Sequence, residues 1–238
     1  MKIGIFTVLY DDRPLEDVLK YVSGLGYEMV EIGAWRGSHH FNLDQILKGG
    51  ATAYKNTIAK YGLSISAINN AVEGQLVLGP LDSVTDDFYK GTPEEKVKYG
   101  MERMKKTAEA AAALDVSVVD GFIGAPYWGA WYIWPPKYEQ IYEEGFKLFA
   151  ERWGEILDHF KAQGIKFALE VHPHEQAYNI ETAEQALKAI NYKKEFGFNF
   201  DPSHLLWQGI DPVVYINKFG DRIYHMHAKD AELVKENI

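Results

Sequence analysis

The chain of 238 residues contains no cysteine, which excludes both a disulfide framework and a thiolate metal site. Any metal ion must therefore be held by carboxylate and imidazole groups. An excess of positive charge is also absent, because 34 Asp and Glu residues outnumber 25 Lys and Arg residues and give a formal net charge of -9 at pH 7. A partner held through its phosphates needs a basic surface, so this balance argues against nucleic acid.

Long apolar runs are absent as well, since no stretch approaches the roughly 20 apolar residues of a membrane-spanning helix. Residues 1–10 lack the long apolar region and the small-residue cleavage site of a signal peptide. What the sequence does contain is 47% apolar and 14% aromatic residues, enough for a large core in one domain. We therefore expect a cytoplasmic protein without a membrane partner.

Short apolar runs alternate with longer amphipathic segments along the chain, an order typical of βαβ units and a parallel sheet. The pattern predicts seven strands, at residues 2–8, 29–34, 64–69, 116–123, 166–171, 196–200 and 223–228. Helices are predicted at residues 14–25, 43–61, 94–114, 138–163 and 182–190, with a further helix that begins at residues 211–212.

The predicted fold class is α/β, and specifically a TIM (β/α) barrel. No glycine-rich Rossmann or P-loop pattern accompanies the strands, which disfavours a doubly wound sheet. A full barrel needs an eighth strand, but only ten residues follow residue 228. We therefore expect residues 1–238 to form a single barrel domain, truncated at the C-terminus and lacking the eighth βα unit. The first and seventh strands would then be open edges that another chain, as in a homo-oligomer, or a further segment covers, unless the two strands pair and close the sheet with seven.

Polar clusters follow the fifth, sixth and seventh predicted strands at matching positions. These clusters are Glu170, His172 and His174 in ALEVHPHE, Asp201 and His204 in FNFDPSH, and His225, His227, Lys229 and Asp230 in YHMHAKD. Because a carboxylate inside a barrel strand is costly to bury unless it is paired or metal-bound, the clusters are expected to converge on one point. Carboxylate oxygens and imidazole nitrogens without sulfur suit Mn, Zn, Mg or Co ions.

The segments ALEVHP, FGFNFDPSH and FGDRIYHMHAKD resemble those of the sugar phosphate isomerase/epimerase group in the xylose isomerase-like TIM barrel superfamily. The resemblance is strong over residues 167–230 and weaker elsewhere. It implies that Glu170, Asp201 and His227 ligate a divalent metal ion, and that His204 binds substrate or a second metal. The group's fourth ligand, a Glu that ends an eighth strand, has no counterpart in this sequence.

The resemblance also implies a metal-dependent isomerase or epimerase that acts on a sugar, a polyol or a sugar phosphate. In such a site the ion acts as a Lewis acid on a hydroxyl and the neighbouring carbonyl. It thereby stabilises the enediolate that forms when a carboxylate removes the proton between them. Glu170 is the predicted base, with one oxygen on the ion and the other exchanging the proton.

Other side chains are candidates for contacts with a small-molecule sugar. His172 and Lys229 would lie at the rim of the site, where they could equally be ordinary surface groups. Residues 124–137 form a long loop with aromatic residues, namely Tyr127, Trp128, Trp131, Tyr132 and Trp134. Trp128 is the one that we expect to stack on the sugar, and packing of the loop or a subunit contact would account for it equally well.

Two other function classes remain open. One is a metal-dependent hydrolase or lyase of the same superfamily, with its endonuclease branch disfavoured by the acidic charge. The other is a non-catalytic carbohydrate-binding barrel whose site is incomplete. Asp201 could also be a helix cap, His225 could be structural, and Glu31 is a weaker candidate for a polar group that faces the sugar. The number of metal ions per chain would separate these classes.

Overall fold

The computed structural model describes residues 2–129, 134, 136–234 and 236 of the chain. Its strands form one sheet in sequential order, and every neighbouring pair is parallel. The strands are β1 (Gly4–Phe6), β2 (Met29–Gly33), β3 (Ser64–Asn69), β4 (Val118–Gly121), β5 (Lys166–Glu170), β6 (Phe196–Phe200) and β7 (Ile223–Met226). The predicted α/β fold is confirmed, in the form of a half-barrel of seven parallel strands.

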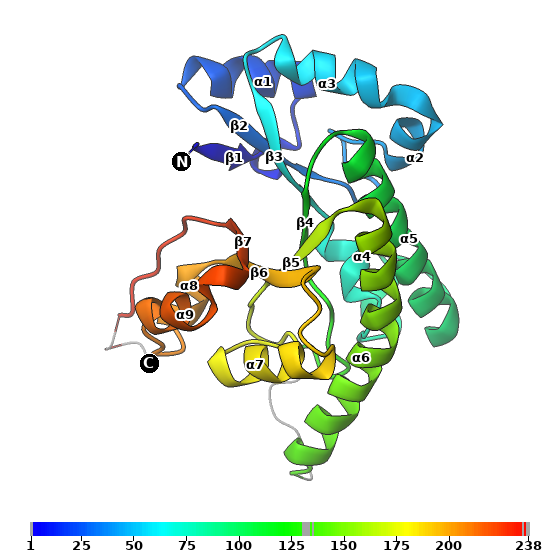
Figure 1. Cartoon of the computed structure of the whole chain (residues 1–238), viewed down its shortest axis with the longest axis vertical. Helices are drawn as coiled ribbons and strands as arrows, with labels where there is room; N and C mark the ends of the chain where they lie inside the picture. The colour runs from blue at the N-terminus through cyan, green and yellow to red at the C-terminus, as the bar shows by residue number, and fades with distance from the viewer. Residues whose placement is uncertain (1, 130–133, 135, 235, 237–238) are drawn as a thin grey trace.

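The helices cover the outer side of this sheet, and Figure 1 shows the two longest, α5 and α6, running side by side. The α-helices are α1 (Leu15–Gly24), α2 (Leu43–Gln45), α3 (Ala51–Ala59), α4 (Ala71–Gln75), α5 (Pro93–Ala113), α6 (Tyr138–Gln163), α7 (Ile180–Ala189), α8 (Pro202–Leu206) and α9 (Pro212–Phe219). Shorter turns are η1 (Thr7–Tyr10), η2 (Ile46–Gly50), η3 (Ser83–Thr85) and η4 (Gly220–Arg222). Within the described residues, none of the helices has the length and apolar character that crossing a membrane requires.

The structure departs from the sequence prediction in three places. The helix predicted over residues 43–61 is interrupted at Gly49, which adopts a φ of 103°. Residues other than glycine rarely adopt this backbone conformation. Residues 70–93, for which the sequence analysis predicts neither a helix nor a strand, contain α4, whose first turn is capped by the side chain of Asn70. A second short helix, α8, begins directly after β6 and was also missed.

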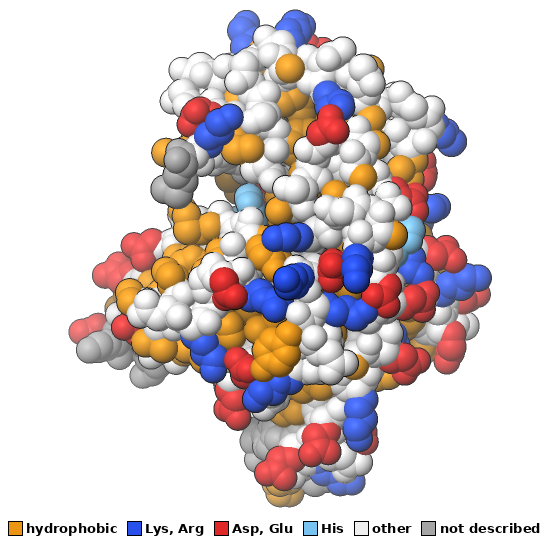
Figure 2. Space-filling view, in the orientation of Figure 1, with side chains coloured by type: hydrophobic (Ala, Val, Ile, Leu, Met, Phe, Trp, Pro, Cys, Tyr) orange, Lys and Arg blue, Asp and Glu red, His pale blue; other side chains and the backbone are white. Residues whose placement is uncertain are grey.

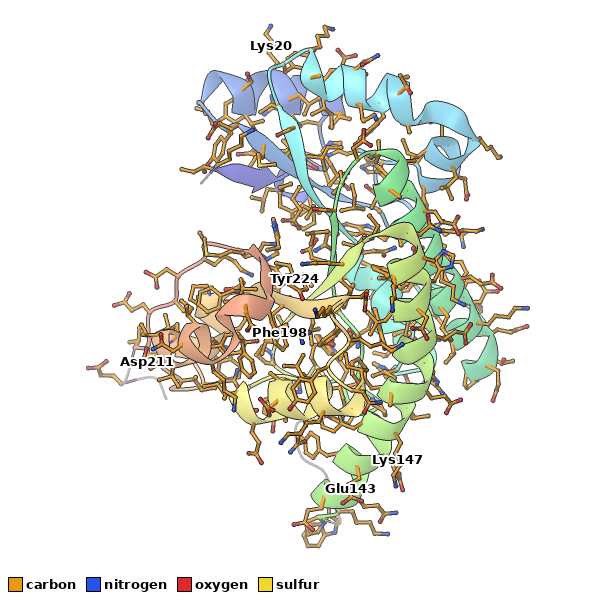
Figure 3. The ribbon with its side chains drawn as sticks, in the orientation of Figure 1. Lys20, Glu143, Lys147, Phe198, Asp211 and Tyr224 are labelled. Atoms are coloured by element: carbon orange, nitrogen blue, oxygen red, sulfur yellow. The ribbon has the colours of Figure 1, made fainter. Side chains whose placement is uncertain are left out.

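Side chains alternate between the two faces of each strand, which separates the apolar core from a polar interior. Phe198 on β6 is fully buried and its ring contacts Tyr215 and Phe219 of α9 (Figure 3). The next residue, Asn199, faces the inside of the half-barrel, where it donates a hydrogen bond to Asp120 of β4. The inside of the half-barrel therefore carries polar groups while the outside packs on the helices.

β1 and β7 are the two edges of the sheet, and no backbone ladder joins them in the described part of the chain. This outcome agrees with the expectation that the first and seventh strands do not close the barrel. A cavity of about 650 Å³ lies between the edges, with Glu31, Glu170, His225 and His227 among its lining residues. Figure 2 shows the molecule hollowed between the segments that carry β1 and β7.

Replacing Phe198 with Ala should remove the main contact between β6 and α9. We expect the free energy of unfolding to fall by about 3–5 kcal/mol, the usual loss for a buried phenylalanine. Urea denaturation followed by circular dichroism measures this quantity. Val213→Ala on the same helix is the control, because Val213 is 58% exposed and should change stability by less than about 0.5 kcal/mol. Similar losses in both variants would contradict this assignment of the core.

Candidate active site

Two buried carboxylates meet at the ends of β5 and β6. Glu170 is the last residue of β5, and Asp201 directly follows β6. His204, on α8, lies between them, with its Nε2 atom 3.1 Å from Glu170 Oε1 and 3.3 Å from Asp201 Oδ2. One ligand atom from each of these three residues lies within 4.8 Å of the others. The structure therefore brings together three of the residues predicted for the site.

Asp201 has two roles, one for each oxygen. Its Oδ1 atom caps α8 by accepting hydrogen bonds from the backbone N–H of Ser203, at 3.0 Å, and from the Ser203 hydroxyl, at 2.6 Å. Pro202 occupies the first turn, where a missing N–H is tolerated. The cap fixes the side chain so that Oδ2 faces His204. The helix-cap interpretation is thus correct for one oxygen, and it leaves the other oxygen for the site.

Lys229 completes the rim of this group. Its ammonium lies 2.5 Å from Asp201 Oδ2 and 3.3 Å from Glu170 Oε1, and half of its side chain is exposed. Burial alone would lower the pKa of Lys229, but Asp201 and Glu170 outweigh it and raise that pKa. Burial would likewise raise the pKa of Glu170, yet His204, His227 and Lys229 together hold it well below its usual range.

His227, on the strand-end segment after β7, connects this group to a deeper one. Its Nδ1 atom is 3.5 Å from Glu170 Oε1, while its Nε2 atom is 2.9 Å from Glu31 Oε2. Glu31, Asp120, His225 and His227 also offer ligand atoms within 4.8 Å of one another. His227 therefore lies in the deeper group and reaches the first group only through Glu170.

The deeper group is a network of buried hydrogen bonds. Glu31 Oε2 accepts from His225 as well as from His227, at 3.0 and 2.9 Å. Burial would raise the pKa of Glu31, but the hydrogen bonds and charges of the two histidines together outweigh burial and lower the pKa to about 2. Asp120 Oδ2 accepts from the amides of Asn69 and Asn199 at 2.9 and 3.0 Å. Burial and the neighbouring Glu31 raise the pKa of Asp120 to about 7.

The donor spacing of the first group fits a divalent ion. Bonds of about 2.0–2.3 Å to such an ion hold neighbouring donor atoms roughly 3–3.5 Å apart. His204 Nε2 lies 3.1 Å from Glu170 Oε1 and 3.3 Å from Asp201 Oδ2, and His227 Nδ1 approaches Glu170 Oε1 from the deeper group to 3.5 Å. Oxygen and nitrogen donors without sulfur suit Mn, Zn, Mg or Co.

Aromatic rings border the first group on one side. The ring of Trp128 stacks on His172 with centroids 5.4 Å apart and an angle of 14° between the planes. The His172 ring contacts His204 edge to face at 4.2 Å. His174, two residues later, is exposed, and its ring centroid lies 6.3 Å from that of Trp128. The other aromatic residues singled out in this loop include Trp131 and Tyr132, which lie outside the described residues.

The sequence interpretation missed Asp120, Asn69 and Asn199. Asp120 ends the apolar run VSVVD, so it carries the same signal that identified Glu170. Asn69 and Asn199 give no comparable signal, because an uncharged amide can be buried in a strand without a metal ion or a charged partner.

Glu175, in the loop after β5, was also missed. Its Oε2 atom accepts the backbone N–H groups of Ile123 and Gly124, both at 2.9 Å, and thereby joins this loop to the segment after β4. Its Oε1 atom is buried with no hydrogen-bond partner among the described residues. Burial outweighs the two N–H donors and raises the pKa of Glu175 to about 8.

A family model described as the xylose isomerase-like TIM barrel matches residues 19–237 of this sequence. The chain belongs to the xylose isomerase-like TIM barrel family. The resemblance inferred from the three strand-end segments is thereby confirmed. Membership accounts for the parallel sheet and for polar clusters at the ends of its strands.

Other proteins match most of the chain. The uncharacterized protein YfiH of Bacillus subtilis (strain 168) is 29% identical, over 98% of this chain and 74% of YfiH. Fructoselysine 3-epimerase of Escherichia coli O157:H7 is 23% identical, over 98% of this chain and 77% of the epimerase. The crystal structure of 3-keto-D-glucoside 4-epimerase, YcjR, from E. coli superposes with a TM-score of 0.70 at 16% identity. It covers 95% of this chain and 78% of YcjR.

The buried carboxyl of Glu175 generates a prediction about pH. Its pKa is raised to about 8 in the folded chain, so folding is penalised as the pH rises from the ordinary value near 4.5 towards 8. Glu175→Gln keeps an oxygen acceptor for the two N–H groups and cannot ionise. We therefore expect its stability relative to the parent to rise by up to about 1.4 kcal/mol per pH unit between pH 5 and 8.

Urea denaturation at pH 5, 6.5 and 8 checks this expectation. Glu143→Gln is the matched control, because Glu143 is exposed on α6 (Figure 3) and should give no such trend. A stability difference for Glu175→Gln that stays constant with pH would show that the carboxyl is already ionised in the folded chain.

Proposed function

We propose that this chain is a divalent-metal-dependent isomerase or epimerase that acts on a sugar or polyol by proton transfer next to a carbonyl. The observation that carries the proposal is the meeting of Glu170, Asp201 and His204 at the ends of β5 and β6, at donor spacings that fit one ion, with His227 Nδ1 3.5 Å from Glu170 Oε1. The two carboxylates are buried, and a metal ion would add to the compensation that Lys229, His204 and His227 give them, which supports a cation site.

The similar proteins support the same reaction class. Two of them carry the names fructoselysine 3-epimerase and 3-keto-D-glucoside 4-epimerase. Both names describe the inversion of a carbinol centre in a sugar that carries a substituent. Inversion beside a carbonyl requires the removal and return of one proton, which is the chemistry that a carboxylate beside a Lewis acid can perform.

We assign Glu170, Asp201 and the Nδ1 atom of His227 as the ion's ligands, with His204 on the side of the substrate. Glu170 and Asp201 each turn one oxygen towards this point, and Nδ1 of His227 faces Glu170. When bound, the ion would supply Lewis acidity to the carbonyl and hydroxyl of the sugar. Mn, Zn, Mg and Co all suit this donor set.

Side chains of this protein would carry out the proton transfer and hold the sugar. Among the described residues, the ion pairs and hydrogen bonds of Glu170 all involve Oε1. Oε2 is therefore the atom that we assign to take the proton from the sugar carbon and return it. Lys229 and His204, both beside Oε1, would hold the sugar's hydroxyl oxygens. His172 and Trp128 would form the wall beside the sugar.

Deuterium exchange tests the function directly. The chain, loaded with each metal in turn, is incubated with a panel of ketoses in D₂O, and products are followed by NMR. We expect deuterium to enter the carbon beside the carbonyl, at one metal ion per chain. Glu170→Gln should lower this rate by about 10²–10⁴-fold, whereas Glu181→Gln, which is exposed on α7, should not change it. Loss of water from the sugar without exchange, or two or more ions per chain, would contradict the proposal.

Glu31→Gln should weaken binding of the ion, although Glu31 is not one of the assigned ligands. The hydrogen bond from His227 Nε2 to Glu31 fixes which imidazole nitrogen is free to face Glu170. Loss of such an outer partner usually lowers metal affinity by about 10–100-fold. Competition with a chromophoric chelator at constant pH measures this affinity. Glu28→Gln is the control, because Glu28 is exposed just before β2. Equal affinities in both variants would show that Glu31 does not orient His227.

A further inference from the structure

A second cavity, of about 220 Å³, lies beside the candidate active site. It is formed by α4, by the segment around η3 and by the segment after β4. Its lining residues are Ala71, Val72, Gln75, Pro80, Val84, Thr85, Phe88, Phe122 and Trp128. Lysine and arginine are absent from this lining within the described residues, so the cavity offers no charge for a phosphate.

The cavity shares a wall with the active site. Trp128 lines the cavity and also stacks on His172, whose ring contacts His204. Phe122 lines the cavity as well, and its ring centroid lies 5.1 Å from that of His172. A molecule held at His204 could therefore extend along these rings into the cavity.

The apolar lining leaves surface that no other part of the described chain covers. Val84 is 69% exposed, and Val72, Phe88, Phe122 and Trp128 are each partly exposed. Apolar side chains that line a concavity in this way are typical of a binding site.

One polar atom in the lining also lacks a partner. Gln75 is 5% exposed and donates from Nε2 to the carbonyl of Gly79 at 2.7 Å. Its Oε1 atom is buried with no hydrogen-bond partner among the described residues. An unpaired buried acceptor is unfavourable, and this one belongs to a residue of the cavity lining.

The wall that carries Val84 and Phe88 is built before any ligand arrives. Lys96 of α5 is 1% exposed, and its ammonium donates to the carbonyl of Asp82 and to the hydroxyl of Thr85. The hydroxyl of Thr85 in turn donates to the carbonyl of Pro80 at 3.0 Å. This buried lysine holds the segment in place, so the cavity needs little rearrangement to accept a ligand.

We propose that this cavity binds an apolar substituent, an alkyl or aryl group, that the sugar substrate carries. The inference rests on the proposed function and goes further by naming the substrate class: a substituted sugar rather than a free sugar or a sugar phosphate. A cavity of about 150 Å³ can hold a benzene ring, so this one has room for a phenyl or short alkyl group. Trp128 and Phe122 line the cavity and also border His172, so a substituent on a sugar held at His204 would extend along these rings towards the cavity.

Calorimetric titration of the metal-loaded chain with n-alkyl β-D-glucosides, from methyl to hexyl, tests the proposal. Each added methylene should raise the affinity by roughly fourfold until the cavity is filled. Phenyl β-D-glucoside should bind more tightly than methyl β-D-glucoside, and glucose 6-phosphate should gain nothing over glucose.

Val84→Asp places a carboxylate at the rim of the cavity, and the exposure of Val84 makes misfolding a minor concern. This variant should lose at least tenfold in affinity for the hexyl glucoside and little for the methyl glucoside. Val213→Asp is the matched control, since Val213 is equally apolar, 58% exposed and distant from the cavity on α9. Chain-length gains that survive in Val84→Asp, or no gain with chain length, would overturn the proposal.

The outcomes also separate this inference from the proposed function. If ketoses exchange deuterium but substituents add no affinity, the subsite is wrong and the enzyme assignment stands. If the chain-length gain is present and sensitive to Val84→Asp while no ketose exchanges deuterium, the subsite stands and the enzyme assignment is wrong.

Discussion

The imidazole of His227 is the contact on which the two polar groups inside this protein depend. One ring nitrogen faces Glu170 and the other donates to Glu31, so a single side chain links the middle of β2, the end of β5 and the segment after β7. Buried charges are tolerated only when opposite charges or hydrogen bonds compensate them. Each group therefore constrains the other. A change at Glu31 alters how His227 meets Glu170, and the orientation of the His227 ring determines which of its nitrogens faces Glu170.

The open edge of the sheet gives these groups access to the outside. β1 and β7 do not pair in the described residues, and a cavity lies between them. Hydrogen bonds from His225 and His227 reach Glu31 on β2, the neighbour of β1, and so link the two sides of this gap. The polar interior is consequently part of what holds the two edges together, as well as part of the candidate site.

The segments between the strands and helices shape the surroundings of the candidate site. Glu175 joins the segments after β4 and β5, and Lys96 fixes the segment around η3. Both are buried polar groups that hold backbone in place, which is an effective way to shape an irregular segment. The rings of Trp128 and Phe122 then form a wall between the carboxylate site and the apolar cavity. Under the proposed function, the strands would supply the chemistry and the loops would select the sugar.

The sequence by itself determined the parallel α/β architecture and the carboxylates at the strand ends. Apolar runs of strand length alternate with helical patterns, and the predicted bounds of residues 64–69, 138–163 and 196–200 agree with β3, α6 and β6. Local spacing also identified Glu170 and Asp201, because a carboxylate that ends a buried run is costly unless it is paired or bound to a metal. Only the tertiary structure decided that His204 lies between those two carboxylates while His227 reaches across to Glu31. The reason is physical: alternation says which face of a strand a side chain occupies, but the curvature and register of seven strands determine which side chains on that face meet.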